Sequence, residues 1–278
     1  MLSGKTTLIA HIGFPTTAFK APLIYNPWFE SKGIDAMVVP MSVKAEDYPV
    51  SLREIFKMDN VHGALITMPH KVTTVDLVDE LSTTAKIAGA CNAILKRPDG
   101  SLLGDMFDGS GFVRGIQRNG FKCEGAKVLL AGAGGVGSAI AASLAAAGVG
   151  AISVYKTRSD AAVNLVARLQ EHYPQIDTKL VYTTDVAGFD LIVNGSPLGM
   201  KDDDPLPFDL TNLAPTTFVG EVVMKKEMTP LLEIAKTKGC PYVIGTAMLF
   251  EMIPAYLEFF GFGTSTPDEL RSVAKIQY

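Results

Sequence analysis

Lys71, Asn92 and Asp108 carry an amine, an amide and a carboxyl group, and each lies just beyond a segment with the pattern of a β-strand. In an α/β sheet the carboxyl ends of strands converge on one crevice, where ligands bind. An amine and a carboxyl group that meet there can accept and return a proton at a reacting oxygen. The alternative for Lys71, which lies in TMPHKVTT between a strand pattern and a helix pattern, is an exposed residue at a helix start.

A second set of residues has the spacing of a phosphate-binding turn. Gly132, Gly134 and Gly137 follow the pattern G-x-G-x-x-G between the strand-like KVLLA and an alanine-rich helix. Gly132 permits a tight turn, Gly134 lets the backbone approach a pyrophosphate, and Gly137 lets the helix pack closely on the strand. The free N–H groups around Gly135 and Val136 would face the anion. The pattern predicts dinucleotide binding, and the alternative is a purely structural glycine turn.

The residues after the next strand indicate which dinucleotide binds. The segment VYKTRSD offers Lys156, Thr157 and Arg158, with no acidic residue before Asp160. An NAD site usually has an acidic residue here for the ribose hydroxyls, whereas cations suit a 2′-phosphate. The sequence therefore favours NADP over NAD. The other reading is a pair of solvated surface charges.

Composition excludes several classes of protein. The 278 residues carry a formal net charge of −4, and only 19% of them are charged, which argues against nucleic-acid binding. Three cysteines and four histidines show no metal-ligand spacing, so we expect no metal site and reduced thiols. The amino terminus has no signal-peptide pattern, and we expect a cytoplasmic protein. A separate expectation is a monomer or homodimer whose partner is a small-molecule substrate.

One uncharged stretch, residues 128–155, is long enough to cross a bilayer. Glycines interrupt it at AGAGG and again at AGVGA, dividing it into strand, turn, helix, turn and strand. We therefore interpret it as a buried βαβ unit and expect no membrane span.

The rest of the chain alternates strand-like and helix-like segments, which predicts an α/β fold with two domains. Residues 1–107 form a substrate domain with a mostly parallel sheet, completed by C-terminal helices within 247–278. Residues 108–246 form a Rossmann-type, doubly wound NAD(P)-binding domain. Two further expectations are a helix from about His70 to Leu81 and a β-hairpin around Pro98-Asp99-Gly100.

Eight motifs occur in the same order as in a known family: IGFPTTAFKAPLIYN, TMPHK, GACNAI, GDMFDGSGF, GAGGVGSA, NGSPLGM, TPLL and GTAMLF. Along nearly its whole length the chain resembles the shikimate dehydrogenase family. The resemblance implies hydride transfer between a nicotinamide and a secondary alcohol, with Lys71 and Asp108 as the acid/base pair. Thr67 and Asn92 would contact the substrate. Further cofactor contacts implied by the matched motifs are Asn194, Gly195, Ser196, Gly245 and Met248.

The chain departs from the family pattern where polar groups would hold shikimate. The resemblance places Phe19 and Ala21 at the two serines, Leu65 and Met252 at an asparagine and a glutamine, and Met224 at a tyrosine. Met106 and Phe107 stand at the Asn-Thr pair that precedes the aspartate. A substrate carboxylate or hydroxyl without donors costs several kcal/mol, so shikimate and quinate should be poor substrates, and a less polar alcohol or ketone should fit better.

Three alternatives stay open from the sequence. The substituted positions are core residues if the alignment is shifted by one residue. The chain is an authentic shikimate or quinate dehydrogenase if Lys20 pairs with the substrate carboxylate in place of the serines. It is a non-catalytic dinucleotide-binding sensor if it has lost its chemistry, although Lys71, Asn92 and Asp108 would then have no purpose.

Overall fold

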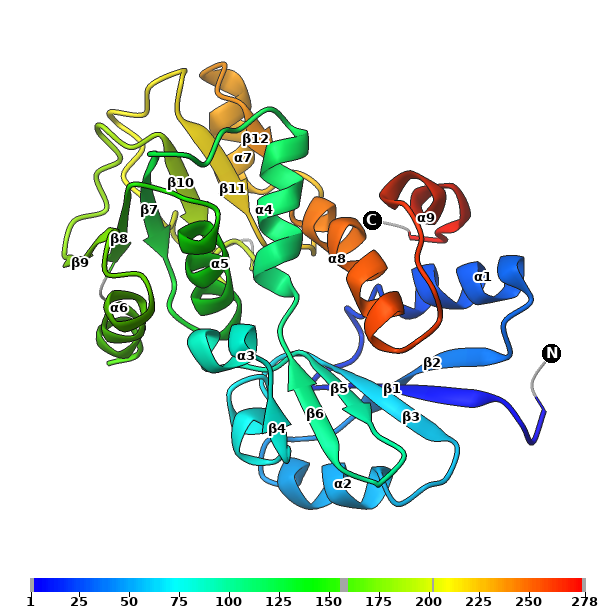
Figure 1. Cartoon of the computed structure of the whole chain (residues 1–278). Helices are drawn as coiled ribbons and strands as arrows, with labels where there is room; N and C mark the ends of the chain where they lie inside the picture. The colour runs from blue at the N-terminus through cyan, green and yellow to red at the C-terminus, as the bar shows by residue number, and fades with distance from the viewer. Residues whose placement is uncertain (1–2, 156–159, 202, 277–278) are drawn as a thin grey trace. The chain divides into compact units, whose positions relative to one another are not determined.

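The computed structural model describes residues 3–155, 160–201 and 203–276. The chain divides into two compact units, which are drawn in Figure 1. The first unit contains the chain up to Phe107 and the segment from Met252 onward, and the second contains Asp108–Glu251. Each unit has a six-stranded sheet with helices on its faces, so the predicted two-domain α/β fold class is confirmed. The chain returns from the second unit to the first between Glu251 and Met252, inside helix α8 (Gly245–Phe259). The sequence predicts this boundary at residue 247.

The sheet of the first unit is mixed, with the strand order β2-β1-β3-β5-β6-β4. Strands β1, β2 and β3 are parallel, β5 is antiparallel to β3 and β6, and β4 is parallel to β6. The β5–β6 pair is the predicted hairpin. The strand bounds are β1 (Thr7–Gly13), β2 (Ala36–Ser42), β3 (Val61–Ile66), β4 (Glu80–Leu81), β5 (Ala93–Lys96) and β6 (Leu102–Asp105).

Strand β1, an interior strand of this sheet, is covered on both faces, which explains why its residues are nearly all apolar. On one face Ile12 packs in a core with Leu52 from helix α2 (Tyr48–Ile55). Helices α1 (Pro22–Lys32) and α9 (Pro267–Val273) lie on the other side of this sheet, as Figure 1 shows.

The apolar C-terminal part of α8 belongs to the first unit. Gly63 in β3 leaves room for an aromatic ring, because a side chain there would meet the ring of Phe260. The Nε2 atom of His62 lies 2.9 Å from the carbonyl oxygen of Phe260. This close packing fixes the end of α8 to the sheet.

The predicted helix from His70 to Leu81 is wrong. The segment forms one turn of 3₁₀-helix, η1 (Thr73–Asp76), followed by strand β4, and helix α3 (Thr83–Ala88) comes after it. Thr74 donates its hydroxyl to the carbonyl oxygen of His70 at 2.8 Å, and β-branched residues at 72–75 disfavour a long helix. The pairing of β4 with β6 replaces the helical hydrogen bonds. Lys71 is therefore not at the start of a long helix.

The second unit has a parallel sheet in the order β12-β11-β10-β7-β8-β9, which is the Rossmann arrangement. Its uncharged stretch forms β7, α5 and β8, so the predicted βαβ unit is confirmed. The strand bounds are β7 (Lys127–Ala131), β8 (Ala151–Tyr155), β9 (Asp177–Val181), β10 (Leu191–Asn194), β11 (Phe218–Glu221) and β12 (Tyr242–Val243). The helices that begin in this unit are α4 (Asp108–Arg118), α5 (Gly135–Ala146), α6 (Ala161–His172), α7 (Pro230–Thr237) and α8.

Alternate residues of the parallel strands point to opposite faces of this sheet. Leu129 and Val219 enter the core that α7 closes, together with Leu232. On the helix α4 side, Gly220 leaves room for the ring of Phe112. Both faces are thus buried, as expected for a parallel sheet.

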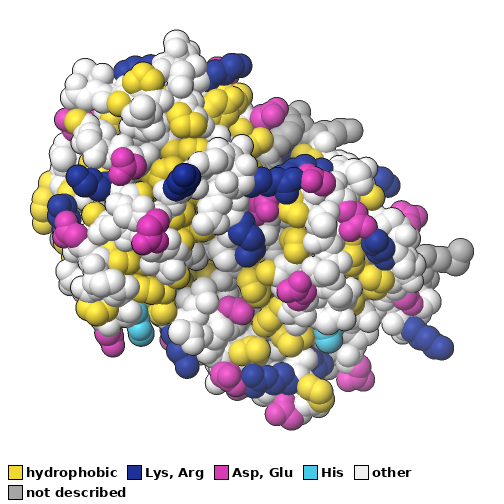
Figure 2. Space-filling view, turned by 45° about the horizontal axis from the view of Figure 1, so that its top comes forward, with side chains coloured by type: hydrophobic (Ala, Val, Ile, Leu, Met, Phe, Trp, Pro, Cys, Tyr) yellow, Lys and Arg dark blue, Asp and Glu magenta, His cyan; other side chains and the backbone are white. Residues whose placement is uncertain are grey.

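No helix within the described residues is long and apolar enough to span a bilayer. The same residues contain no group of three or more histidine, cysteine or acidic side chains able to hold a metal ion. On the face of the molecule shown in Figure 2, basic and acidic side chains are interspersed.

Candidate functional site

The glycine turn after β7 depends on residues without side chains. Gly132 has φ +100°, a left-handed conformation that favours glycine, and a Cβ there would lie 2.6 Å from the carbonyl carbon of Gly195. A Cβ on Gly137 would fall against the carbonyl oxygen of Gly132. The strand, the turn and the first turn of α5 can therefore approach each other only with glycine at these positions.

Gly134 differs from these two glycines, because a Cβ built on it would have nothing within 4 Å. It is the N-cap of α5, and no side chain caps the helix there. The residues of the first helical turn, Gly135 and Val136, follow directly. The N-terminus of α5 thus has the open space and the uncapped N–H groups that an anionic group requires.

The loop after β10 lies beside the glycine turn. The backbone nitrogen of Gly195 donates to the carbonyl oxygen of Ala131 at 2.8 Å. The side-chain oxygen of Asn194 accepts hydrogen bonds from the hydroxyl of Ser196 at 2.6 Å and from its backbone nitrogen at 3.1 Å. Three of the predicted cofactor residues therefore lie at the carboxyl edge of the sheet, next to the glycine turn.

Glu221, at the end of β11, is a buried residue that the sequence analysis did not single out. Its carboxylate accepts hydrogen bonds from Asn194 at 2.9 Å, from Thr229 at 2.9 Å, and from the backbone nitrogens of Val222 and Val223 at 2.8 and 3.0 Å. Burial raises the pKa of Glu221, and these hydrogen bonds oppose that effect. One carboxylate thus ties the loop after β10 to the loop after β11 and to the start of α7.

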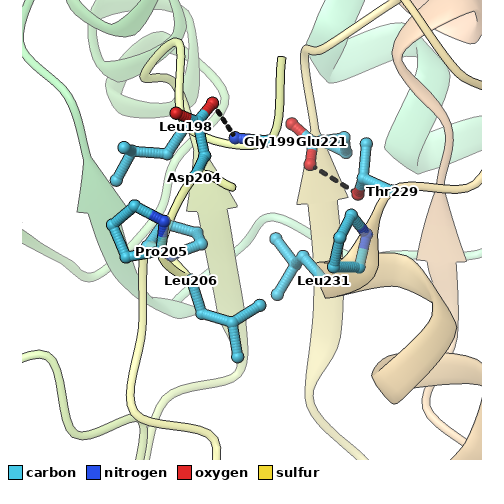
Figure 3. A pocket seen from close by; sticks show the side chains of 10 residues that line it. Leu198, Gly199, Asp204, Pro205, Leu206, Glu221, Thr229 and Leu231 are labelled. Atoms are coloured by element: carbon cyan, nitrogen blue, oxygen red, sulfur yellow. Dashed lines mark hydrogen bonds between the residues drawn. The ribbon is translucent and has the colours of Figure 1, made fainter. Parts of the chain in front are cut away.

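Figure 3 shows a small pocket next to this carboxylate, with the bond from Thr229 to Glu221 as a dashed line. Asp204 also borders the pocket and accepts a hydrogen bond from the backbone nitrogen of Gly199 at 3.0 Å. Because its polar groups are already hydrogen-bonded within the chain, this pocket is a poor candidate for a substrate site.

The last predicted cofactor residues lie at the start of α8. A Cβ on Gly245 would meet the carbonyl group of Val223, so the helix begins in close contact with the loop after β11. Met248, one turn later, is buried. Lys156, Thr157 and Arg158, the residues on which the choice of NADP depends, lie outside the described residues.

In the first unit, hydrogen bonds connect the segments that carry Lys71 and Asn92. The carbonyl oxygen of Lys71 accepts from the backbone nitrogen of Cys91 at 2.8 Å. Asn92 is only 1% exposed, and its side-chain oxygen accepts from the backbone nitrogen of Phe107 at 2.9 Å. Its carbonyl oxygen accepts from the hydroxyl of Tyr256 at 3.3 Å. Asn92 therefore holds the strand ends of this unit together.

Asp108 is the residue directly after Phe107 and the first residue of α4. The bond from Phe107 to Asn92 thus fixes the point at which the chain enters that helix. Lys71 is 9% exposed and Asp108 is 2% exposed. Two ionisable side chains with so little exposed surface are candidates for a functional role.

The substituted positions separate into two groups by burial. Four of them are buried among other residues: Ala21, Leu65, Met106 and Met252. Three are half-buried: Phe19, Phe107 and Met224. The ring of Phe107 packs at a centroid distance of 4.7 Å from Tyr256, and Thr67, one of the retained polar residues, is also half-buried.

His11 is a second residue that the sequence analysis missed. It lies in the middle of β1, paired in register with Leu65, and its ring stacks on Phe19 at a centroid distance of 4.0 Å. The charge of Lys71 acts on it and, after burial, is the second cause of its lowered pKa. The signal in the sequence was one polar residue inside the otherwise apolar run LIAHIG.

A Rossmann-type domain with a glycine turn, joined to a separate α/β domain, defines the class of two-domain nucleotide-dependent oxidoreductase folds. The model of the "Shikimate dehydrogenase substrate binding domain" matches residues 12–94. Among relatives, the shikimate dehydrogenase (NADP(+)) of Rubrobacter xylanophilus is 34% identical over 89% of this chain and 88% of its own. The shikimate dehydrogenase (NADP(+)) of Acidiphilium cryptum is 32% identical over 99% of this chain and 98% of its own.

A solved structure is similar as well. The shikimate 5-dehydrogenase of Listeria monocytogenes, in complex with shikimate and NAD, matches with a TM-score of 0.87 and 26% identity over 98% of this chain and 97% of that one. The chain belongs to the shikimate dehydrogenase family.

Proposed function

We propose that the protein is an NADP-dependent oxidoreductase that interconverts a secondary alcohol and a ketone, with Lys71 and Asp108 as its acid/base pair. The observation that carries this proposal is the hydrogen bond from the backbone nitrogen of Phe107 to Asn92. It holds the residue that precedes Asp108 against Asn92, and the residue before Asn92, Cys91, is bonded in turn to the carbonyl oxygen of Lys71 at 2.8 Å. The order of motifs in the family and the low exposure of both ionisable side chains support the same assignment.

In this proposal, the amine Nζ of Lys71 accepts the proton of the substrate hydroxyl and returns it in the reverse reaction. The carboxylate of Asp108 orients that amine and contacts the same oxygen. Asn92 positions Asp108 through its hydrogen bond to the backbone of Phe107. It positions Lys71 through the neighbouring residue Cys91, whose backbone nitrogen donates to the carbonyl oxygen of Lys71. When bound, the nicotinamide supplies the hydride acceptor or donor.

The described part of the second unit fits a dinucleotide. The open space at Gly134 and the uncapped start of α5 suit a pyrophosphate, and Asn194, Gly195 and Ser196 border the same edge. Gly245 and Met248 complete the proposed set of cofactor contacts. We choose NADP because Lys156 and Arg158 can pair with a 2′-phosphate, with Thr157 between them, and because the relatives bear the name NADP(+). NAD is the alternative.

We further propose that shikimate is not the preferred substrate. Phe19, Ala21, Leu65, Met224 and Met252 offer no side-chain donors where the family pattern has polar residues. A carboxylate or hydroxyl placed against them loses hydrogen bonds that it makes with water, which costs several kcal/mol. A substrate without the carboxylate avoids this cost.

A second candidate function is authentic shikimate or quinate dehydrogenase. The identities of 32% and 34% to proteins with that name favour it. In this case Lys20, which is half-buried on the same loop as Phe19, would pair with the substrate carboxylate.

The test is an absorbance assay at the nicotinamide band, with NADP and a panel of shikimate, quinate and uncharged cyclic alcohols. We expect turnover of an uncharged alcohol with a kcat/KM at least about tenfold above that of shikimate. A preference for shikimate would overturn the substrate assignment and favour the second candidate. Binding of NADP without turnover of any alcohol or ketone would overturn the enzyme assignment and favour a sensor.

A further inference from the structure

His11 is the one histidine in the first unit whose imidazole forms no hydrogen bond with the described residues. Its Nδ1 atom is shielded from solvent and has no partner there, and the residue as a whole is 8% exposed. In contrast, His62 and His70 place Nε2 atoms 2.9 and 2.8 Å from the carbonyl oxygens of Phe260 and Val43.

An unpaired buried polar atom is costly, so its presence calls for an explanation. Leaving such a group without a partner destabilises a protein, because the group loses the hydrogen bond that it makes with water in the unfolded chain. An apolar residue in the middle of β1 would avoid this cost, since the neighbouring residues Ala10 and Ile12 are both fully buried. A partner that arrives with a ligand would account for the histidine.

The neighbours of His11 are residues to which the proposed function already gives substrate contacts. The ring of Phe19 stacks on the imidazole with an interplanar angle of 26°. The ring of Phe19 and the side chain of Thr67 both lie against Gly13. A Cβ on Gly13 would meet atoms of these two side chains. Lys71 is close enough for its charge to act on His11.

The imidazole of His11 is neutral near pH 7. Burial and the charge of Lys71 lower its pKa to about 3. A neutral imidazole has one nitrogen that donates and one that accepts a hydrogen bond. A hydroxyl group can pair with either nitrogen, whereas a carboxylate can pair only with the donor and an ammonium group only with the acceptor.

We infer that His11 is a specificity-determining residue that binds a second hydroxyl group of the substrate, which makes the preferred substrate an uncharged cyclic diol or hydroxyketone. The inference rests on the proposed function, because Lys71 takes the reacting hydroxyl or carbonyl group. The apolar face of the substrate ring packs near Phe19. The second hydroxyl supplies the hydrogen bond that Nδ1 of His11 lacks, once substrate binding has displaced the residues that shield this atom.

The first experiment measures how much a second hydroxyl improves a substrate. We compare kcat/KM for the cyclohexanediols with kcat/KM for cyclohexanol, using NADP and the full chain. The wild-type protein should prefer at least one diol. His11→Leu should lower the diol-to-cyclohexanol ratio about tenfold, the loss expected for one hydrogen bond, and His11→Gln should retain part of the preference.

The matched control is His62→Leu, which removes a hydrogen-bonded histidine from the neighbouring strand β3. It should lower stability and leave the diol-to-cyclohexanol ratio unchanged. A ratio that is the same in wild type and His11→Leu would overturn the inference, and so would a ratio that falls equally in His62→Leu.

The second experiment needs no variant and no turnover. In ¹⁵N NMR spectra of the wild-type chain with NADP bound, the His11 imidazole resonances should shift when a cyclohexanediol is added, and cyclohexanol should shift them much less. Equal shifts, or none, would overturn the role of His11 even if alcohols are oxidised. If no alcohol in the panel is oxidised, the proposed function fails, and the NMR result still decides whether His11 binds a hydroxyl group.

Discussion

The side-chain oxygen of Asn92 lies 2.9 Å from the backbone nitrogen of Phe107, so a buried amide holds the chain at the residue before Asp108. The backbone of Asn92 is held as well, because its nitrogen donates to the carbonyl oxygen of Asp105 at 2.9 Å. The neighbouring residue, Cys91, donates to the carbonyl oxygen of Lys71 at 2.8 Å. A shift of Asn92 would therefore affect both proposed proton-transfer residues.

Asn92→Ala should lower kcat by roughly tenfold or more and leave the Kd for NADP nearly unchanged. The variant leaves the nitrogen of Phe107 without its partner, which costs about 1–3 kcal/mol and loosens the entry to α4. Steady-state kinetics and a cofactor titration measure the two effects. The control is Asn119→Ala, which removes a 2.9 Å bond to the carbonyl oxygen of Gly115 near the other end of α4. Equal losses of kcat in both variants would contradict a positioning role for Asn92.

Lys71→Met and Asp108→Asn should each lower kcat by roughly 10²–10⁴-fold, because each removes one member of the proposed acid/base pair. Cofactor affinity should change little, since the glycine turn is untouched. Lys86→Ala, which removes an exposed lysine from α3, is the control and should retain full activity. A Lys71→Met variant with near wild-type kcat would exclude this lysine as the base.

Much of the fold follows from local patterns in the sequence. Glycines at 132, 134 and 137 are typical of a tight turn between a strand and a helix, and apolar runs are typical of buried parallel strands. These two patterns predict the βαβ unit. The 3₁₀ turn at Thr73–Asp76 was not, because the bond from Thr74 to His70 and the pairing of β4 with β6 are contacts that apolar spacing does not reveal.

The site was less predictable than the fold. Motifs predicted Lys71, Asn92 and Asp108, whereas Glu221 emerges from its burial and its hydrogen bonds to distant segments. His11 emerges from a buried Nδ1 atom without a partner among the described residues. The four hydrogen bonds to Glu221 come from residues 194–229, which lie on separate loops of the chain. The sequence around Glu221 does not indicate which distant residues donate hydrogen bonds to its carboxylate.

Gly137→Ala and Gly134→Ala should weaken cofactor binding for different reasons. A methyl group at Gly137 strikes the carbonyl oxygen of Gly132, so that variant should lose both thermal stability and NADP affinity. A methyl group at Gly134 meets nothing within 4 Å, so that variant should keep its melting temperature and lose only affinity. Thermal melts with and without NADP separate the two effects. A destabilised Gly134→Ala with normal affinity would contradict the proposed pyrophosphate position.

Glu221 should make stability depend on pH in a direction opposite to that of most carboxyl groups. Its pKa is raised in the folded protein, so the stability that it contributes is fully present below its unfolded pKa of about 4.5 and is lost as pH rises through the raised value. Glu221→Gln keeps an acceptor for Asn194 and cannot ionise. The free energy of unfolding of wild type minus that of the variant should therefore fall as pH rises from 4.5. A difference that is constant from pH 4 to pH 8 would contradict the raised pKa.

Replacing Lys156 and Arg158 together with alanine should weaken NADP binding by about tenfold or more and leave NAD binding nearly unchanged. The physical reason is that only NADP carries the 2′-phosphate with which two cations can pair. The loss should shrink as salt concentration rises, because counterions screen the phosphate. Lys179→Ala, which removes an exposed cation from β9, provides a control for general charge effects. Cofactor titrations of both nucleotides measure the outcome, and equal losses for NADP and NAD would show that these residues do not select the cofactor.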